Sequence, residues 1–407
     1  MQVTTKQGLF YFFPVFFCFC LPFGSLLLSG IIVAWTVASF FVFNREKAAR
    51  GFRRPFLWLL YAFFFVTLAS ALFSDDKQAA LFEVEIRLGF LVIPYLFFCF
   101  DYPPGILRRC VVAFVSGCFF CCLYLIGRAF IYSVAGHPEY FFYTHFSFFI
   151  HAGYFAMYLV MAIVFVVVLY PRWFREQRPV IYSSWFFVAF FVTGIFLCAS
   201  KMGIITFFVS LPLLTFYRLS GKNRLKAIGF SVASVVTVAI LGALIFPSSF
   251  DRWSNMFSVP ANVDPSSTES TAVRVLIWKE SWRLAQENLL TGTGVGDANA
   301  TLYKAYAQEG MTGAFTHRLN AHNQYLQTMI GLGLTGLFLL LACTAGQLIR
   351  ALRHKHFLLA VFSLVILLNF LVESMLQASA GTLFFLFFVC FFNLADEEQL
   401  MSSPVRE

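Results

Sequence analysis

Charged side chains are scarce in this chain of 407 residues. Only 12% of the residues are Asp, Glu, Lys or Arg, whereas 60% are hydrophobic and 19% are aromatic. A soluble domain of this length could not cover its surface with so few charges, so a soluble fold is excluded. The apolar stretches have the length of helices, and the alternating pattern of a membrane β-barrel is absent. The sequence therefore predicts an all-α polytopic membrane protein.

Motifs for nucleotide hydrolysis and metal binding are also missing. The chain has no Walker motif, no GxSxG and no HExxH sequence, so ATP-driven transport is unsupported. Its ten cysteines lie in or beside apolar stretches, where cysteine packs as a small hydrophobic residue, and they predict no disulfide framework. The glycine-rich segment Gly292 to Gly296 does not follow a predicted strand, so we interpret it as a turn after a helix. No cofactor is predicted.

Asp75 and Asp76 form an adjacent acidic pair that allows two interpretations. The pair could bind a divalent metal in a metal-dependent transferase, because hard cations prefer carboxylate ligands. Alternatively, Ser74, Asp75 and Asp76 begin a short helix that runs to Glu85, where acidic side chains favour the N-terminus. We favour the second interpretation, so no metal site is predicted.

Apolar stretches near the ~20 residues that a bilayer requires divide the chain. Twelve of them are predicted to be transmembrane helices, at about 8–23, 25–43, 55–73, 88–100, 106–134, 150–170, 181–198, 202–217, 227–246, 325–349, 357–375 and 380–395. The predicted organisation is residues 1–246 with nine helices, a large polar loop at 247–324, residues 325–396 with three helices, and a cytoplasmic tail at 397–407.

The basic residues predict the orientation of the chain. The net charge is +9, but the Lys and Arg residues cluster in short segments between alternate apolar stretches. Such clusters mark the cytoplasmic ends of membrane helices. This pattern places both termini in the cytoplasm and the loop at 247–324 on the opposite side of the membrane. We therefore expect contact with membrane lipids and none with nucleic acid.

The polar loop has an irregular first part and a helical second part. Pro247 to Ser270 is rich in Ser, Pro and Asn and is predicted to be irregular. A helix then begins at Ser270 or Thr271 and ends near Asn288. The spacing on this helix places four side chains on one face, namely Arg274, Trp278, Ser281 and Trp282.

Four basic residues, Arg87, Arg128, Lys201 and Arg274, lie in this loop or at helix ends on its side of the membrane. Charges at such positions are often functional, although a long cationic side chain can also extend to interfacial water. Both interpretations stay open for Arg87 and Arg128, whereas we favour function for Lys201 and Arg274. Converging cations would suit a diphosphate, which Arg binds through two hydrogen bonds and Lys as a point charge. Glu373 is predicted to pair with one of these cations in a structural role.

Histidines near the loop are candidate proton acceptors. Asn320 is predicted to cap the tenth transmembrane helix, which places His322 in the first turn of that helix. Imidazole titrates near neutral pH and the positive end of a helix favours its neutral form, so His322 is the best candidate base. His317 is less well placed. For His145 and His151 we favour a role as interfacial hydrogen-bonding residues over one as functional residues that line a cavity.

These motifs together resemble the O-antigen ligase and polymerase superfamily. The most specific part is Arg274-(x)3-Trp278, then Gly292 to Gly296, then His322-Asn323-Gln324-Tyr325-Leu326 ahead of Gly331-Leu332-Gly333. Other matching segments are Ala199-Ser200-Lys201-Met202-Gly203, His151 with Tyr154 to Leu159, and Glu373-Ser374. The family usually has arginine at the position of Lys201, so this chain keeps the charge but loses the bidentate geometry.

The resemblance implies a GT-C-like fold and a metal-independent, inverting glycosyltransferase of the bacterial inner membrane, with its active site facing the periplasm. The implied donor is a glycan linked to undecaprenyl diphosphate, and the implied acceptor is a sugar hydroxyl of lipid A–core. By the motif match, His322 would be the general base and Arg274 would hold the departing diphosphate. From the resemblance and the charges we assign to substrate binding Lys201, Arg87, Arg128, Trp278, His317, Asn323 and His151. Glu373 would support the site.

Three other functions remain open. An O-antigen or polysaccharide polymerase would extend another lipid-linked glycan, and a protein O-oligosaccharyltransferase would modify Ser or Thr. A transporter of lipid-linked glycans would need cations but not His322. Transporters often contain inverted repeats and broken helices, and neither is evident in the sequence. The leading prediction is therefore a ligase that acts by a single displacement and inverts the anomeric carbon.

Overall fold

The structure is a computed structural model that describes residues 5–103, 105–174, 178–219, 224–246, 266 and 271–394. Every regular element within these ranges is helical, and the ranges contain no strand. The segment from Pro247 to Ser270 that was predicted to be irregular, apart from Ser266, and the predicted tail at 397–407 lie outside the described residues. The all-α class is confirmed for the described part.

A helix occupies each predicted apolar stretch. These helices are α1 (Thr5–Cys20), α2 (Ser25–Phe41), α4 (Pro55–Phe73), α6 (Gly89–Phe98), α7 (Ile106–Val134), α9 (Ala152–Val168), α11 (Arg178–Cys198), α12 (Lys201–Leu219), α13 (Arg224–Ile245), α18 (Gln324–Arg353), α19 (Phe357–Val372) and α20 (Ser379–Leu394). Within the described ranges, 7 helices are long and apolar enough to cross a membrane. α6 has only 10 residues, and such a helix covers about 15 Å, half of the hydrocarbon thickness. Twelve crossings therefore stay a prediction.

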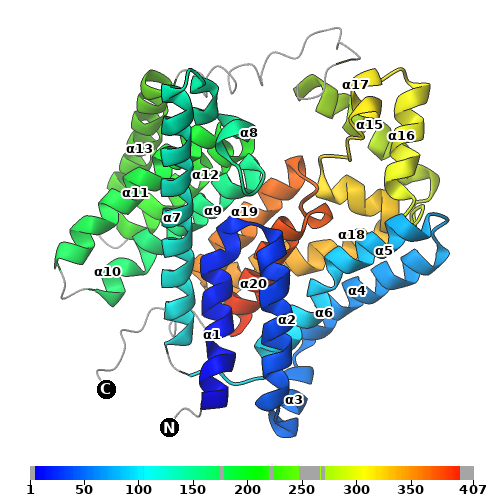
Figure 1. Cartoon of the computed structure of the whole chain (residues 1–407), viewed down its shortest axis with the longest axis horizontal. Helices are drawn as coiled ribbons and strands as arrows, with labels where there is room; N and C mark the ends of the chain where they lie inside the picture. Colours follow the sequence, from blue (N-terminus) through cyan, green and yellow to red (C-terminus); the bar gives the residue numbers. More distant parts are fainter. Residues whose placement is uncertain are drawn as a thin grey trace.

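Further helices and turns lie between these helices. They are α3 (Arg45–Phe52), α5 (Lys77–Arg87), α8 (Tyr143–Phe146), α10 (Tyr170–Trp173), α15 (Thr271–Glu287), α16 (Ala298–Gln308) and α17 (Thr312–Thr316), with 3-10 turns η1 (Leu21–Phe23), η2 (Pro138–Phe141) and η3 (Met375–Gln377). Figure 1 shows α15, α16 and α17 grouped at the upper right, at the end of the molecule opposite α3. α15 confirms the predicted helix in the polar loop. Asp76 caps α5 by accepting a hydrogen bond from the Ala79 N–H (2.9 Å), which confirms the capping interpretation.

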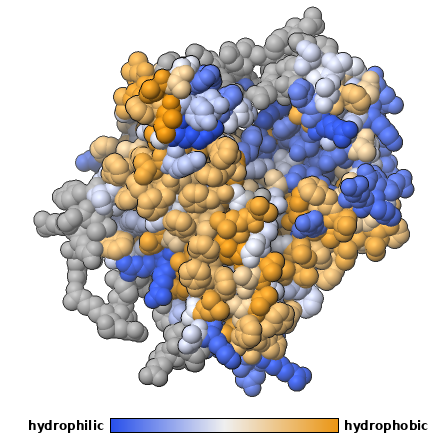
Figure 2. Space-filling model, in the orientation of Figure 1, coloured by the Kyte–Doolittle hydropathy of each residue, from blue (hydrophilic) through white to orange (hydrophobic). Residues whose placement is uncertain are grey.

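The surface matches a protein that lies in a membrane. Figure 2 shows a broad hydrophobic band, with hydrophilic side chains gathered over the region of α15 to α17 and at the lower end near α3. Large apolar side chains are exposed on the peripheral helices α2 and α13, among them Leu26, Phe40, Leu225, Ile228 and Leu244. Monomeric soluble proteins rarely expose such continuous apolar surface, whereas lipid chains cover it.

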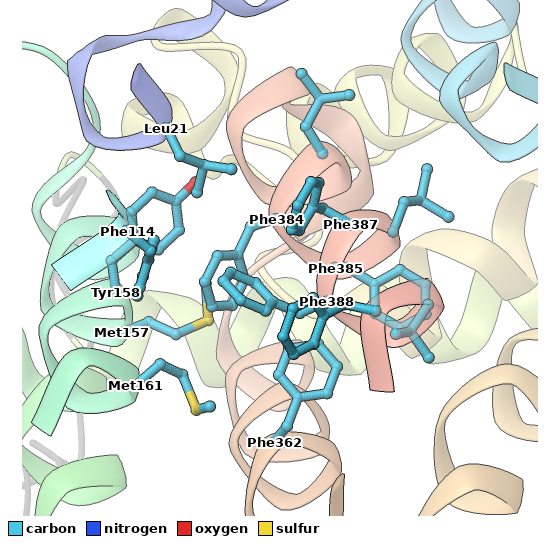
Figure 3. Close-up of a cluster of buried hydrophobic side chains, with 14 of the residues drawn as sticks. Leu21, Phe114, Met157, Tyr158, Met161, Phe362, Phe384, Phe385, Phe387 and Phe388 are labelled. Atoms are coloured by element: carbon cyan, nitrogen blue, oxygen red, sulfur yellow. The ribbon is translucent and has the colours of Figure 1, made fainter. Parts of the chain in front are cut away.

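α20 is the central helix of the bundle. Every residue from Ala380 to Phe392 is buried, as expected for a helix that is hydrophobic on all sides. Phe388 lies edge-on to Phe114 of α7, with ring centroids 5.0 Å apart. Phe384 stacks on Tyr158 of α9 at 4.4 Å (Figure 3). Close van der Waals packing of this kind is the main force that holds helices together in lipid.

The two ends of α20 have different surroundings. At its C-terminal end, Arg54 donates a hydrogen bond to the carbonyl of Asn393 (3.1 Å), and Arg350 bonds to the Asn393 side chain. Arg54 lies between the second and third predicted apolar stretches and Arg350 between the tenth and eleventh, and the predicted orientation makes both segments cytoplasmic. The other end of α20 follows Glu373 and η3, and a helix of 16 residues separates the two ends by roughly 24 Å. The basic clusters and the predicted site therefore lie at opposite ends of the bundle.

α18 is broken within its length, although no broken helix was evident in the sequence. Gly333 has φ 62° and ψ −159°, a conformation that glycine adopts without steric cost. The N–H of Leu334 consequently donates to the carbonyl of Leu289 (2.8 Å) and not to that of Ile330. Sequence reasoning missed the break because a glycine within an apolar stretch is common in membrane helices. The break leaves the carbonyls of Ile330 and Gly331 in need of other donors.

The glycine-rich turn at 292–296 supplies those donors. Thr293 donates to the carbonyl of Ile330 through its N–H (2.7 Å) and its hydroxyl (3.0 Å). The N–H of Gly294 donates to the carbonyl of Gly331 (3.2 Å). The predicted turn is confirmed, and its position against α18 gives the glycines a packing role.

The same turn also binds the corner between α4 and α5. The Ser70 hydroxyl of α4 accepts a hydrogen bond from the Val295 N–H (3.0 Å). The carboxylate of Asp297 accepts hydrogen bonds from the N–H groups of Asp75 and Asp76 (2.8 and 2.9 Å). The region that contains α15 to α17 is therefore anchored on both α4–α5 and α18.

Replacing Gly292 by alanine should destabilise the protein. Gly292 has φ 72°, and a Cβ there would lie 2.5 Å from backbone atoms of Gly331 and Leu332. A strained residue costs about 1–3 kcal/mol and the clash adds to this, so the melting temperature in detergent should fall clearly. Gly310→Ala is the matched control, because Gly310 has φ 67° but no atom lies within 4 Å of its Cβ position. An equal fall in melting temperature in the two variants would contradict tight packing of the turn on α18.

Candidate functional site

Most of the predicted polar residues meet where helices begin or end. Arg274 is in the first turn of α15, His322 precedes the cap of α18, and Glu373 follows α19. His151 caps α9, and Lys201 is the first residue of α12. α9, α12 and α19 contact one another, and α18 contacts both α15 and α19. Segments that are far apart in the sequence thus converge at the end of the bundle opposite α3 (Figure 1).

Glu373 is at the centre of this cluster. Its Oε1 accepts a hydrogen bond from Nη2 of Arg274 (3.1 Å), and Nη1 of Arg274 donates to the carbonyl of Val372 (3.0 Å). Its Oε2 lies 3.5 Å from Nδ1 of His322, an ion-pair distance longer than a close hydrogen bond. One carboxylate therefore bridges a guanidinium and an imidazole.

The surroundings of Glu373 keep it ionised. Its side chain is only 14% exposed. Burial raises the pKa of Glu373, but the contact with His322 and the charges of Arg274 and His151 outweigh burial and lower the pKa to about 2. The site therefore contains a permanent anion beside its cations at physiological pH.

His322 does not lie in the first turn of α18, and Asn320 is not the cap of that helix. The cap is Asn323, whose Oδ1 accepts a hydrogen bond from the Tyr325 N–H (3.0 Å). Asn320 instead accepts a hydrogen bond from the N–H of His322 (3.0 Å), and His322 has φ 45°. Either asparagine could cap a helix on sequence grounds. The left-handed backbone is uncommon for histidine and is typical of functional sites that the surrounding structure holds in place.

Trp278 supports the same segment. Its Nε1 donates a hydrogen bond to the carbonyl of His322 (3.3 Å). Arg274, one turn earlier on α15, binds Glu373, so this helix contacts both of the chain segments that form the cluster. Trp282, which was predicted on the same face, is half exposed.

The starts of α9 and α12 pack side by side at the cluster. Nδ1 of His151 accepts a hydrogen bond from the Gly153 N–H, and the Ser200 hydroxyl accepts one from the Gly203 N–H, both at 3.3 Å. A Cβ on Gly153 would lie 3.5 Å from the Ser200 hydroxyl oxygen. Lys201 begins α12 at this contact. Two helix N-termini therefore add partial positive charge beside two basic side chains.

Three of the residues that were predicted to bind substrate are not part of the cluster around Glu373. Arg87 is 3% exposed and its guanidinium pairs with Glu83 on α5. Arg128 donates to the carbonyl of His145 (2.8 Å) and lies about 5 Å from the ring centres of Tyr132, Tyr140 and Phe148. His317 is exposed at the end of α17. Among the described residues, no hydrogen bond or ion pair joins these three side chains to the cluster around Glu373.

Gln324 is a site-supporting residue that sequence reasoning missed. It is fully buried, its Oε1 accepts a hydrogen bond from the Leu376 N–H (2.7 Å), and its Nε2 donates to the Thr328 hydroxyl (3.0 Å). It thereby joins the start of α18 to η3, directly after Glu373. The sequence shows an amide side chain at the start of an apolar stretch. It does not show the hydrogen-bond partner of that amide, which lies 52 residues away.

The fold and the cluster define a polytopic helical membrane protein with a charged site at one end of its helices. Residues 186–341 match a family model described as O-antigen ligase. This match supports the resemblance to the O-antigen ligase superfamily over that part of the chain. The matched part includes Lys201, Arg274 and His322, whereas His151 and Glu373 lie outside it. Among curated proteins, none matches the chain.

Replacing Glu373 by glutamine should reduce stability only where the carboxylate is ionised. The pKa is lowered from 4.5 to about 2, so the ionised group stabilises the folded state above about pH 4.5 and loses this effect as the pH falls toward 2. The difference in melting temperature between wild type and Glu373→Gln should therefore be largest above about pH 5 and shrink in acid. Scanning fluorimetry in detergent measures it, with the exposed Glu85→Gln as control. An unchanged difference in strong acid would contradict the assignment.

Proposed function

We propose that the protein is an O-antigen ligase, which transfers a glycan from undecaprenyl diphosphate to a sugar hydroxyl of lipid A–core. The cluster of Arg274, Glu373 and His322 carries this proposal, because it combines a cation suited to a diphosphate with an imidazole suited to accept a proton. The family match over residues 186–341 supports the same activity. The apolar helices beside the cluster suit the polyprenyl chain of the donor.

His322 is the general base in this mechanism. Its Nδ1 faces Oε2 of Glu373, which favours a proton on Nδ1 and leaves Nε2 as the acceptor atom. The acceptor hydroxyl gives its proton to Nε2 as its oxygen attacks the anomeric carbon, and the bond from that carbon to the diphosphate breaks. The carboxylate of Glu373 stabilises the imidazolium that forms.

Arg274 stabilises the departing diphosphate. A guanidinium has five N–H donors, and the hydrogen bonds of Arg274 within the described residues go to Glu373 and Val372. Its other N–H groups are left for phosphate oxygens. Lys201 and the N-termini of α9 and α12 add to the charge that offsets the leaving group. Because side chains supply this charge, we propose metal-independent transfer.

We place the site on the periplasmic face of the bacterial inner membrane, with both termini in the cytoplasm. Arg54 and Arg350 at the opposite end of α20 support this orientation, because basic residues mark cytoplasmic helix ends. The lipid-linked donor and lipid A–core would then meet at the same membrane surface.

Other functions differ in the acceptor or in the class of protein. A polysaccharide polymerase and a protein O-oligosaccharyltransferase would use the same donor and the same cluster. A transporter of lipid-linked glycans is favoured by one observation, the break in α18, because broken helices often form transport sites. Here, however, Thr293 and Gly294 bind the carbonyls that the break exposes, so those carbonyls do not line a transport path.

The purified protein should glycosylate lipid A–core in the presence of EDTA, as followed on a gel. His322→Ala should lower the rate by about 10²–10⁴-fold, the usual contribution of a general base. Arg274→Ala should lower it by about 10²–10³-fold through loss of electrostatic stabilisation. Arg283→Ala is the matched control, because Arg283 is on the same helix, is 46% exposed and pairs with Glu280.

Each contrary outcome identifies an alternative. Lengthening of the lipid-linked glycan alone would identify a polymerase, and transfer to Ser or Thr of a protein would identify an O-oligosaccharyltransferase. Movement of the intact donor across vesicles without transfer would identify a transporter. Full activity of His322→Ala would exclude this residue as the base, and loss of activity in EDTA would contradict metal independence.

The new linkage should have the opposite anomeric configuration to the donor. A single displacement inverts the attacked carbon, whereas a covalent intermediate would give net retention. NMR coupling constants of the anomeric protons in donor and product measure the outcome. A retained configuration would rule out direct attack by the acceptor hydroxyl.

A further inference from the structure

The segment between α19 and α20 is held by polar side chains that the mechanism above does not use. After Glu373 the chain forms only the single turn η3. In that turn the Leu376 N–H donates to Oε1 of Gln324 (2.7 Å), and Nε2 of Gln377 donates to Oε2 of Glu83 (3.1 Å). Two hydrogen bonds from different helices therefore fix this short segment.

Glu83 belongs to a buried ion pair. Glu83 and Arg87 are 4% and 3% exposed, and the guanidinium binds both the carboxylate and the backbone carbonyl of Glu83. Replacing such a pair by apolar residues is often neutral or stabilising, so stability alone does not account for its presence. What the pair provides is a fixed acceptor for Gln377. We call Gln324, Gln377, Glu83 and Arg87 the polar brace.

We propose that the polar brace positions Glu373 against His322, and that Arg87 acts within it rather than binding the donor diphosphate. This inference rests on the proposed function. The guanidinium of Arg87 is directed at Glu83 inside the protein and has almost no exposed surface. The pocket that Arg87 lines together with Gln377 has a volume of ≈ 10 Å³, about the space of one water molecule, so a lipid diphosphate does not fit beside the guanidinium.

The spacing of the contacts explains how the brace acts. Gln324 lies two residues after His322, and Leu376 lies three residues after Glu373. The contacts His322–Glu373 and Gln324–Leu376 therefore join the same two chain segments. The second contact is fully buried and shielded from water, where a hydrogen bond is stronger. It sets the register of the segment that carries the base against the segment that carries the carboxylate.

The first arm of the experiment removes the hydrogen-bond acceptor of Gln324 and keeps a side chain of similar shape. Gln324→Met should lower kcat for glycan transfer by roughly 10- to 100-fold, because small displacements of catalytic groups are costly. The KM for the donor should stay within about twofold, because binding is not affected. Gln347→Met is the matched control, since Gln347 is buried on the same helix and bonds to Asn393 at the opposite end. It should leave both constants unchanged.

The second arm separates positioning from diphosphate binding by Arg87. Arg87→Gln leaves a buried, unpaired carboxylate and should lower kcat by about tenfold or more. The double variant Glu83→Gln with Arg87→Gln has no net charge and keeps an acceptor for Gln377, so kcat should recover to within about threefold of wild type. Binding of undecaprenyl diphosphate, measured by native mass spectrometry, should be unchanged in the double variant and weakened in Arg274→Gln.

The outcomes distinguish this inference from the proposed function. Weakened binding of undecaprenyl diphosphate in the double variant would show that Arg87 binds the donor, and would overturn the inference. Wild-type kcat in Gln324→Met would also overturn it, while the ligase activity would stand. Absence of transfer by the wild type would instead overturn the proposed function, and the binding measurements would still decide the role of Arg87.

Discussion

The site depends on the stabilisation of one buried anion. A carboxylate in the environment of Glu373 would be costly without cationic and hydrogen-bonding partners, and Arg274 and His322 provide them. Because these partners come from α15 and from the segment before α18, the same interaction holds the polar region of the chain against the membrane helices. The groups suited to proton transfer and to phosphate binding are therefore brought together by an interaction that also shapes the fold.

Length and hydrophobicity were sufficient to predict the helices, because a bilayer imposes both on any segment that crosses it. The capping role of Asp76 and the helix at α15 also followed from local chemistry. The choice between Asn320 and Asn323 as cap did not, since both residue types can accept the same backbone donors. The break at Gly333 depends on hydrogen bonds from a turn about 40 residues earlier in the chain.

The roles of the cations also could not be predicted from the sequence alone. Formal charge makes Arg87, Arg128 and Arg274 all candidates for binding a diphosphate, but their burial and partners differ. The spacing of Glu83 and Arg87 by one helical turn is readable in the sequence, whereas their burial beneath η3 is a property of the tertiary structure. Arg128 lies against the ring of Tyr132 one turn later on α7, and against the rings of Tyr140 and Phe148, which lie beyond the end of that helix.

The break in α18 has a consequence for how the chain enters the membrane. Carbonyl groups that face lipid without a hydrogen-bond donor cost several kcal/mol each, so α18 cannot be completed alone. The donors for Ile330 and Gly331 come from the Ser70 hydroxyl of α4 and from Thr293 and Gly294 in the polar segment, all of which precede α18 and are synthesised first. In the proposed orientation, this polar segment is translocated before α18 inserts and then docks to finish it. Biogenesis of the last three helices is thus coupled to folding on the far side of the membrane.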